Sequence, residues 1–189
     1  MSTAAINRVE KLVSKLCEQQ VEILDRLAGL EARLPESNAP SKTDVIKFLD
    51  GFRAFEELGE ASFGAWIETC TTDQLNGALR TIQMREGGHA RLLGQRLKDL
   101  GAAQSFEVPE EYRVETMECL GSCERSDASK LVEVTSKYTD VDSVIKPITD
   151  FADRLDCDPV TQSLLRSIAD DERSTLTCLF AACAEMNPA

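Results

Sequence analysis

The sequence predicts an all-α protein, and three observations support this fold class. Apolar residues recur every three or four positions in five long segments, which is the spacing of one face of a helix. Residues that favour helix starts and stops, such as Ser41 and Gly101, flank these segments. No stretch alternates apolar and polar residues as a half-buried strand does. The 189 residues are enough for one domain with a substantial core and an appendage.

The first predicted helix spans residues 1–34 and is amphipathic. A linker is predicted at residues 35–42, which contain two prolines and several turn-forming residues. The helix is expected either to lie along the main domain as a brace or to pair with a second copy as a coiled coil. Its apolar residues follow alternating three- and four-residue steps, as in a heptad seam: Ile6, Val9, Val13, Leu16, Ile23, Leu27, Leu30 and Leu34.

The main domain is expected at residues 43–186 and begins with a helical hairpin. Long amphipathic helices are predicted over residues 43–69 and 73–100, and the turn between them is very short. Two long helices joined in this way must pack antiparallel. Thr71 and Gln74 have the spacing of a capping box at the start of the second helix.

Residues 102–140 are less regular, and two short helices are predicted there. The first has Pro109 near its first turn and Gly121 after its end, and the second is capped by Ser126. A helix with a kink at Pro147 is predicted over residues 141–155. The last helix is predicted from Pro159 to about Met186, so that the long helices together make a bundle.

The charge and the cysteine content narrow the class of protein. A net charge of −12 argues against nucleic acid and anionic membrane surfaces as partners. No apolar run approaches the length of a membrane span, and the N-terminus is not signal-like, so a cytoplasmic location is expected. Seven scattered cysteines fit reduced thiols better than a disulfide framework. Cys119 and Cys123 are four residues apart, but a metal site would need two more soft ligands.

Polar residues interrupt the apolar stripes near the centres of three long helices. Glu86 and His89 are three residues apart and project from one face of their helix. Glu60 in the preceding helix and Glu172 in the last helix are expected at a similar depth, with Glu56 as a solvated or flanking carboxylate. Several carboxylates and an imidazole that converge in a core repel one another unless protons or a cation compensate them.

These positions resemble the ferritin-like superfamily of carboxylate-bridged di-iron proteins, which includes rubrerythrins. The similar stretches are FEELGEASFGAW with Glu60, MREGGHARLL with Glu86 and His89, and SIADDERSTL with Glu172. The resemblance implies an antiparallel four-helix bundle, here with an extra N-terminal helix and short connecting helices. It also implies iron, as a single ion or a di-iron pair, or manganese, and chemistry with oxygen or peroxide.

The sequence departs from the family pattern in its second half-site. Thr175 stands where the family has a second His, and no Glu lies on the apolar stripe within residues 140–150. Asp142 and Asp150 lie off that stripe, and the nearest Glu is Glu133 in the preceding short helix. Thr175 is expected to bond back to its own helix.

Glycines stand inside the Glu-x-x-His motif, where helices seldom have them. Gly87 and Gly88 are unfavourable in a helix interior, so a local bulge or a close approach of a neighbouring helix is expected.

Two functional hypotheses follow. In the first, the bundle holds iron or manganese through Glu60, Glu86, His89 and Glu172 and carries out redox chemistry with oxygen or peroxide. In the second, the chain has kept the fold, has lost the di-iron centre and holds no metal, and acts as a structural or interaction protein. A homodimer that forms through the helices is expected. In the second hypothesis the N-terminal helix forms the dimer. The sequence identifies no organic substrate.

Overall fold

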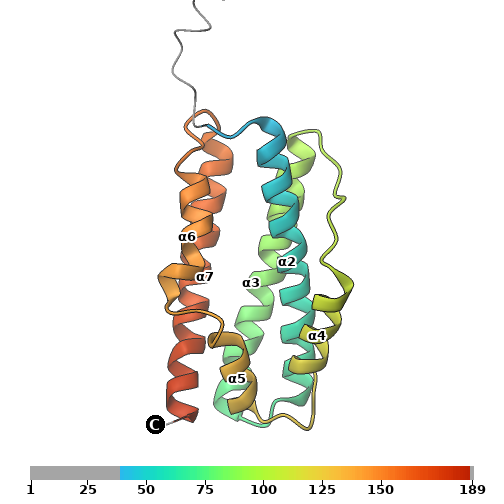
Figure 1. Ribbon diagram of the computed structural model, residues 1–189, viewed down its shortest axis with the longest axis vertical. Coiled ribbons are helices and arrows are strands. Elements are labelled where there is room, and N and C mark those ends of the chain that lie inside the picture. Colours follow the sequence, from blue (N-terminus) through green and yellow to red (C-terminus); the bar gives the residue numbers. More distant parts are fainter. Residues whose placement is uncertain (1–38, 188–189) are drawn as a thin grey trace, which may run out of the picture. The chain divides into compact units, whose positions relative to one another are not determined.

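The computed structural model describes residues 39–187, and over this range the protein is helical without a strand. The N-terminal helix predicted at residues 1–34 and most of the linker lie outside the described residues. None of the described helices is both long and apolar enough to cross a membrane. The helices, labelled as in Figure 1, are α2 (Lys42–Thr69), α3 (Asp73–Asp99), α4 (Glu110–Leu120), α5 (Asp127–Thr135), α6 (Val141–Ala152) and α7 (Pro159–Met186).

Helices α2 and α3 form the predicted antiparallel hairpin (Figure 1). Ser41 caps α2 in a reciprocal capping box, because its hydroxyl accepts from the Asp44 N–H and the Asp44 carboxylate accepts from the Ser41 N–H. The capping box predicted for α3 from Thr71 and Gln74 is wrong. The N-cap is Thr72, and its side chain makes no capping bond within α3.

A carboxylate from α5 holds the α2–α3 turn. Asp127 accepts hydrogen bonds from the backbone N–H groups of Thr71 and Thr72, both at 3.0 Å. It also accepts from the Trp66 indole at 2.8 Å. Asp127 is buried, so these bonds are shielded from water and join α5, the turn and the core of α2.

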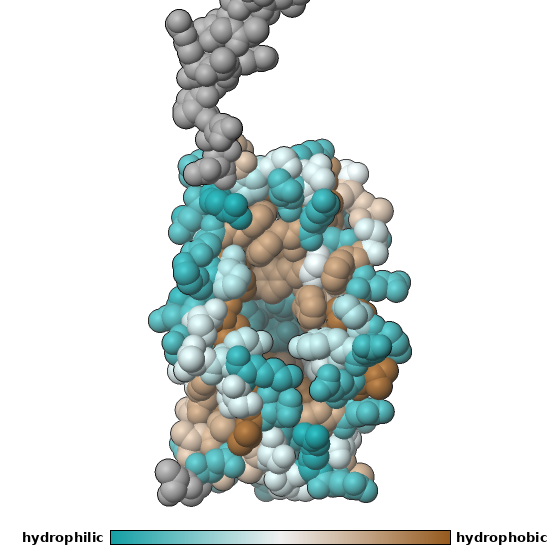
Figure 2. All heavy atoms as spheres, in the orientation of Figure 1, coloured by the Kyte–Doolittle hydropathy of each residue, from teal (hydrophilic) through white to brown (hydrophobic). Residues whose placement is uncertain are grey.

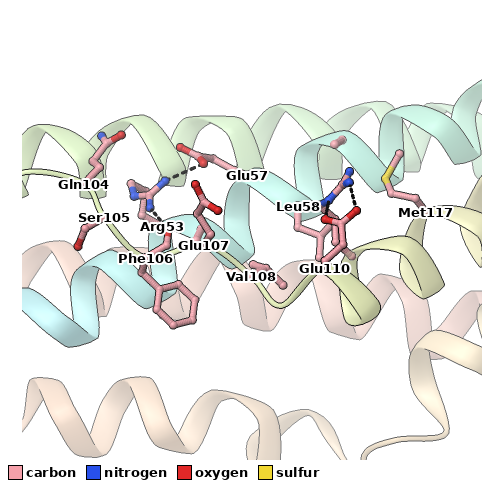
Figure 3. Close-up of a pocket in the computed structure, with 13 residues that line it drawn as sticks. Arg53, Glu57, Leu58, Gln104, Ser105, Phe106, Glu107, Val108, Glu110 and Met117 are labelled. Atoms are coloured by element: carbon pink, nitrogen blue, oxygen red, sulfur yellow. Dashed lines mark hydrogen bonds and ion pairs between the residues drawn. The ribbon is translucent and has the colours of Figure 1, made fainter.

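The segment between α3 and α4 is held against α2 by a buried Asp–Arg pair. Asp50 accepts from the N–H groups of Ser105 and Phe106 at 2.9 and 2.7 Å. Arg53 donates to Asp50. It also donates to Glu57 and to the Phe106 carbonyl (Figure 3). The pocket of about 540 Å³ in Figure 3 therefore has an arginine whose charge is already compensated.

Helix α7 runs beside α3, and the two shorter helices α5 and α6 both pack on α7 (Figure 1). Helix α6 continues through Pro147 and lies along the N-terminal half of α7, where Phe151 stacks on Phe48 of α2 at 3.9 Å between ring centroids. Helix α5 lies near the C-terminal end of α7, where Thr135 bonds to Cys183. The connection between α5 and α6 therefore lies near the middle of α7.

A polar layer divides the apolar core into two clusters. One cluster includes Leu49 of α2 and Leu93 of α3, and the other includes Trp66 and Leu79 of the same helices. The side chains buried between them on α2, α3 and α7 are polar: Glu56, Glu86, His89, Glu172 and Thr175. This layer contains the candidate functional site.

Candidate metal centre

His89 lies at the centre of the polar layer and contacts carboxylates from two other helices. Its Nδ1 is 3.2 Å from Glu56 Oε2 on α2 and 3.1 Å from Glu172 Oε1 on α7. One donor atom from each of these three residues lies within 4.8 Å of the others. Among residues 39–187, this is the one group of three His, Cys, Asp or Glu side chains close enough to share a metal ion.

The other ring nitrogen of His89 also faces a carboxylate. His89 Nε2 lies 3.3 Å from Asp171 Oδ2, and the Asp171 side chain is about half exposed. Metal-binding histidines commonly donate their second N–H to a carboxylate, which fixes the orientation of the ring. The sequence analysis did not single out Asp171. The available signal was its position three residues after the buried Ile168, at the edge of the apolar stripe of α7.

One carboxylate oxygen in the layer is buried without a hydrogen bond. Glu172 Oε1 is inaccessible to solvent, and although it is 3.1 Å from His89 Nδ1 the geometry is not that of a hydrogen bond. The Nδ1 atom is directed to Glu56 instead. A buried carboxylate oxygen without a donor is unfavourable, and a cation between the three side chains would satisfy it.

Of the four residues predicted to hold the metal, the structure brings three together. Glu86, His89 and Glu172 lie in the layer. Glu60 does not, because its side chain is 43% exposed and lies 3.7 Å from Arg91 Nη1. The expectation that Glu56 is solvated or flanking is wrong, because Glu56 is only 4% exposed and contacts His89.

Two glycines explain how these carboxylates are accommodated between α2 and α3. A Cβ atom at Gly59 would lie 2.1 Å from Glu86 Oε2, and one at Gly87 would lie 2.1 Å from Glu60 Oε1. Each glycine therefore leaves space for a carboxylate from the other helix. The expectation of a close approach is confirmed for Gly87, whereas Gly88 has no such neighbour and α3 stays helical through both.

We expect Gly59→Ala to destabilise the protein by about 1–3 kcal/mol, because the new methyl group displaces the buried Glu86 carboxylate. Gly77→Ala is the matched control, since Gly77 is an exposed position of α3 with open space around it. That variant should be about 1 kcal/mol more stable than the parent. Urea denaturation measures both changes. Equal stabilisation by the two substitutions would show that Glu86 does not occupy the space beside Gly59.

Burial and mutual contact shift the protonation of the layer. Burial raises the pKa of Glu86 well above its usual range, and the charges of Glu172 and Glu56 raise it further. Burial likewise raises the pKa of Glu56. Burial alone would lower the pKa of His89, but contacts with Glu172 and Glu56 raise it to about 10. Near pH 7 His89 is therefore a cation, and the raised pKa of Glu86 favours its protonated form.

The metal-free protein is therefore expected to lose stability as the pH rises. A pKa of about 10 in the folded state exceeds the ordinary 6.5 of His89, so its contribution is fully present below pH 6.5 and is lost towards pH 10. The raised pKa of Glu86 acts in the same direction from about pH 4.5 upwards. Urea denaturation in EDTA at pH 6.5 and pH 9 measures the change. A protein that is more stable at pH 9 would contradict the assignment.

The second half-site of the family pattern is absent from the described residues. The Thr175 hydroxyl accepts a hydrogen bond from Arg85 at 3.2 Å, and Thr175 is not one of the side chains that could share an ion. Asp142 pairs with Arg173, and Asp150 pairs with Lys146 at 2.7 Å. Glu133 lies 3.3 Å from Lys137.

The two cysteines considered as a soft-metal or thiol pair differ in their surroundings. Cys119 is buried and accepts from Arg125, whereas Cys123 is exposed. Neither belongs to the group of side chains that could share an ion.

Comparisons of the chain with protein-family models, with curated proteins and with solved structures find no match. The site must therefore be interpreted from its own chemistry. One imidazole nitrogen and several carboxylate oxygens form a donor set suited to iron, manganese or zinc. The set offers no thiolate and thus does not favour a soft ion such as Cu(I).

Proposed function

We propose that this chain is a ferritin-like metal protein that binds one divalent ion, iron(II) or manganese(II), in the polar layer. Glu56, His89 and Glu172 would be the ligands, and Glu86 would lie beside them as a fourth carboxylate. One observation carries the proposal. A potential metal-ligand atom from each of three helices lies within 4.8 Å of the other two, and the three side chains are mostly buried. Relative to the set expected from the sequence, Glu56 replaces Glu60.

The charges of the layer favour a divalent ion. Near neutral pH His89 holds a proton, and burial favours a proton on Glu86 as well. A divalent cation in the layer would take the place of such protons in compensating the carboxylates. Ligands must be deprotonated to bind a metal, so binding should release protons and strengthen as the pH rises.

The arrangement of helices supports the ferritin-like part of the proposal. Helices α2 and α3 form one antiparallel pair, and α7 with α5 and α6 forms the other side of the domain. In a ferritin-like bundle, α5 and α6 together would take the place of one long helix. A single ion fits this chain better than two, because Thr175 and the apolar stripe of α6 supply no second set of ligands. Iron in the site would supply redox chemistry with oxygen or peroxide.

Isothermal titration of the metal-free protein with Fe²⁺, under anaerobic conditions, or with Mn²⁺ tests the proposal. We expect about one equivalent to bind and protons to be released at pH 7, with at least the His89 proton among them, as measured in buffers of different ionisation enthalpy. Glu56→Gln should weaken binding about tenfold or more, because it replaces a charged ligand with a neutral one. Glu60→Gln is the matched control and should leave binding unchanged, since Glu60 is exposed one helical turn away.

Less than about a tenth of an equivalent bound, for both ions, would refute the metal proposal. The alternative is a ferritin-like structural or interaction protein that has lost its metal and dimerises through its helices. One observation favours it, because protonated His89 already contacts both Glu56 and Glu172 and compensates them without a metal. Analytical ultracentrifugation of the full chain and of a chain lacking residues 1–34 tests the dimer.

A further inference from the structure

A pocket of about 230 Å³ leads from the surface to the polar layer. Residues of α4, α5 and α6 line it, and Glu86 and Glu172 belong to its lining. In the orientation of Figure 1, Figure 2 shows a hollow between α2, α5 and α6 with hydrophilic residues at its floor and apolar residues around it. The pocket thus connects the proposed metal ligands with solvent.

The pocket exists because the chain is not helical between α5 and α6. Helix α5 ends at Thr135 and α6 begins at Val141, and this connection lies near the middle of α7. Lys137 and Tyr138 of the connection line the pocket together with Glu172. A continuous helix across this position would cover the polar layer.

One part of the pocket wall is apolar, and the pocket is small. Phe63 of α2 and Leu176 and Leu179 of α7 are buried and line it. A cavity of about 150 Å³ holds benzene, so 230 Å³ corresponds to a molecule of about nine non-hydrogen atoms. Side chains of this kind bind the apolar body of a ligand and leave a polar group to fix its orientation.

The charges around the pocket disfavour a negatively charged ligand. Glu115 and Glu133 line it in addition to Glu86 and Glu172, and its one lysine, Lys137, already pairs with Glu133 at 3.3 Å. A carboxylate ligand would therefore meet several carboxylates and no uncompensated cation. An ammonium ligand would lose its hydration against the apolar part of the wall and would compete with the metal for Glu172.

We propose that this pocket binds a small, uncharged, largely apolar organic molecule with a hydroxyl group and presents it to Glu86 and Glu172. The inference rests on the proposed function in one respect, namely that such a molecule would be the substrate of the metal centre. Binding itself requires only the pocket.

The experiment uses 2-phenylethanol as the probe, with phenylacetate and 2-phenylethylamine as charged analogues of similar size. Methyl-labelled, metal-free full-length protein is titrated, and the NMR signals of Leu176 and Leu179 are followed. We expect 2-phenylethanol to shift these signals and to bind at least tenfold more tightly than either analogue. Thr116→Phe and Val134→Phe, which fill the pocket, should each weaken binding at least tenfold. Met117→Phe is the matched control, because Met117 lines the pocket on the other side of α4.

The outcomes separate this inference from the metal proposal. Equal binding of phenylacetate, or unchanged binding in both filled variants, would overturn the pocket inference, and so would the absence of a shift at millimolar 2-phenylethanol. Titration of the filled variants with Mn²⁺ shows that they are folded and should give the parent affinity. Shifts by 2-phenylethanol in a protein that binds no metal would support the pocket and refute only the metal centre.

Discussion

Replacing His89 with alanine is expected to have two large effects. It should lower the affinity for Fe²⁺ or Mn²⁺ by more than about 100-fold, because even residues that only orient metal ligands contribute 10- to 100-fold. It should also lower the unfolding free energy of the metal-free protein by about 3 kcal/mol at pH 7. The substitution leaves the carboxylates of Glu56 and Glu172 buried without a counter-charge, and breaking a buried ion pair in this way is strongly destabilising.

The two effects are measured separately, by metal titration and by urea denaturation in EDTA. Asp171→Asn is the control for orientation, because the amide keeps a polar group 3.3 Å from His89 Nε2 while removing the half-exposed charge. It should weaken metal binding by about tenfold. It should leave the stability of the metal-free protein nearly unchanged. If His89→Ala is less stable but the parent protein binds no metal, the layer is a structural ion-pair cluster.

The difference between Glu56 and Glu60 shows where the sequence is insufficient. Both residues face α3, and a depth estimate from residue spacing is good only to about one helical turn, or roughly 5 Å. Which carboxylate enters the core depends on the side chains that meet across the hairpin. The Glu60 carboxylate occupies the space beside Gly87 and lies near Arg91. The Glu86 carboxylate occupies the space beside Gly59. These are contacts between helices, and periodicity within one helix does not report them.

Features that depend on residues close together in the sequence were predictable. The all-α class, the α2–α3 hairpin and the shared face of Glu86 and His89 follow from spacing and caps, and the structure confirms them. The contact of Asp171 with His89 joins positions 82 residues apart, and the stripe of α7 gave little reason to expect it. The pocket likewise depends on the connection between α5 and α6 lying at the middle of α7.

Asp127 is a second long-range feature that the sequence did not reveal. It lies in the first turn of α5, where an acidic residue is ordinarily understood as a favourable interaction with the helix dipole. Its bonds instead run to the α2–α3 turn and to Trp66, more than 50 residues away. The α2–α3 turn thus obtains from α5 an acceptor for its backbone N–H groups.

Asp127→Ala is therefore expected to lower the unfolding free energy by about 3 kcal/mol or more. The substitution leaves the buried Trp66 indole N–H without its acceptor, and it does the same to the partly buried backbone N–H groups of Thr71 and Thr72. It also leaves the ammonium group of Lys130, which is fully buried, without the nearby negative charge. Urea denaturation at pH 7 measures the loss. Glu110→Ala, which removes an exposed carboxylate from the first turn of α4, is the control and should change stability by less than about 0.5 kcal/mol.

The pH dependence of a second variant, Asp127→Asn, distinguishes a charged acceptor from simple loss of packing. Burial would raise the pKa of Asp127, but hydrogen bonds from Trp66, Thr72 and Thr71 lower it to about 2. Because the folded-state value lies below the ordinary 3.8, the contribution of the charge is present above pH 4 and is lost as the pH falls towards 2. The difference in stability between the parent and Asp127→Asn should therefore shrink between pH 5 and pH 2.5. A difference that stays constant over this range would mean that the shape of the side chain, and not its charge, stabilises the turn.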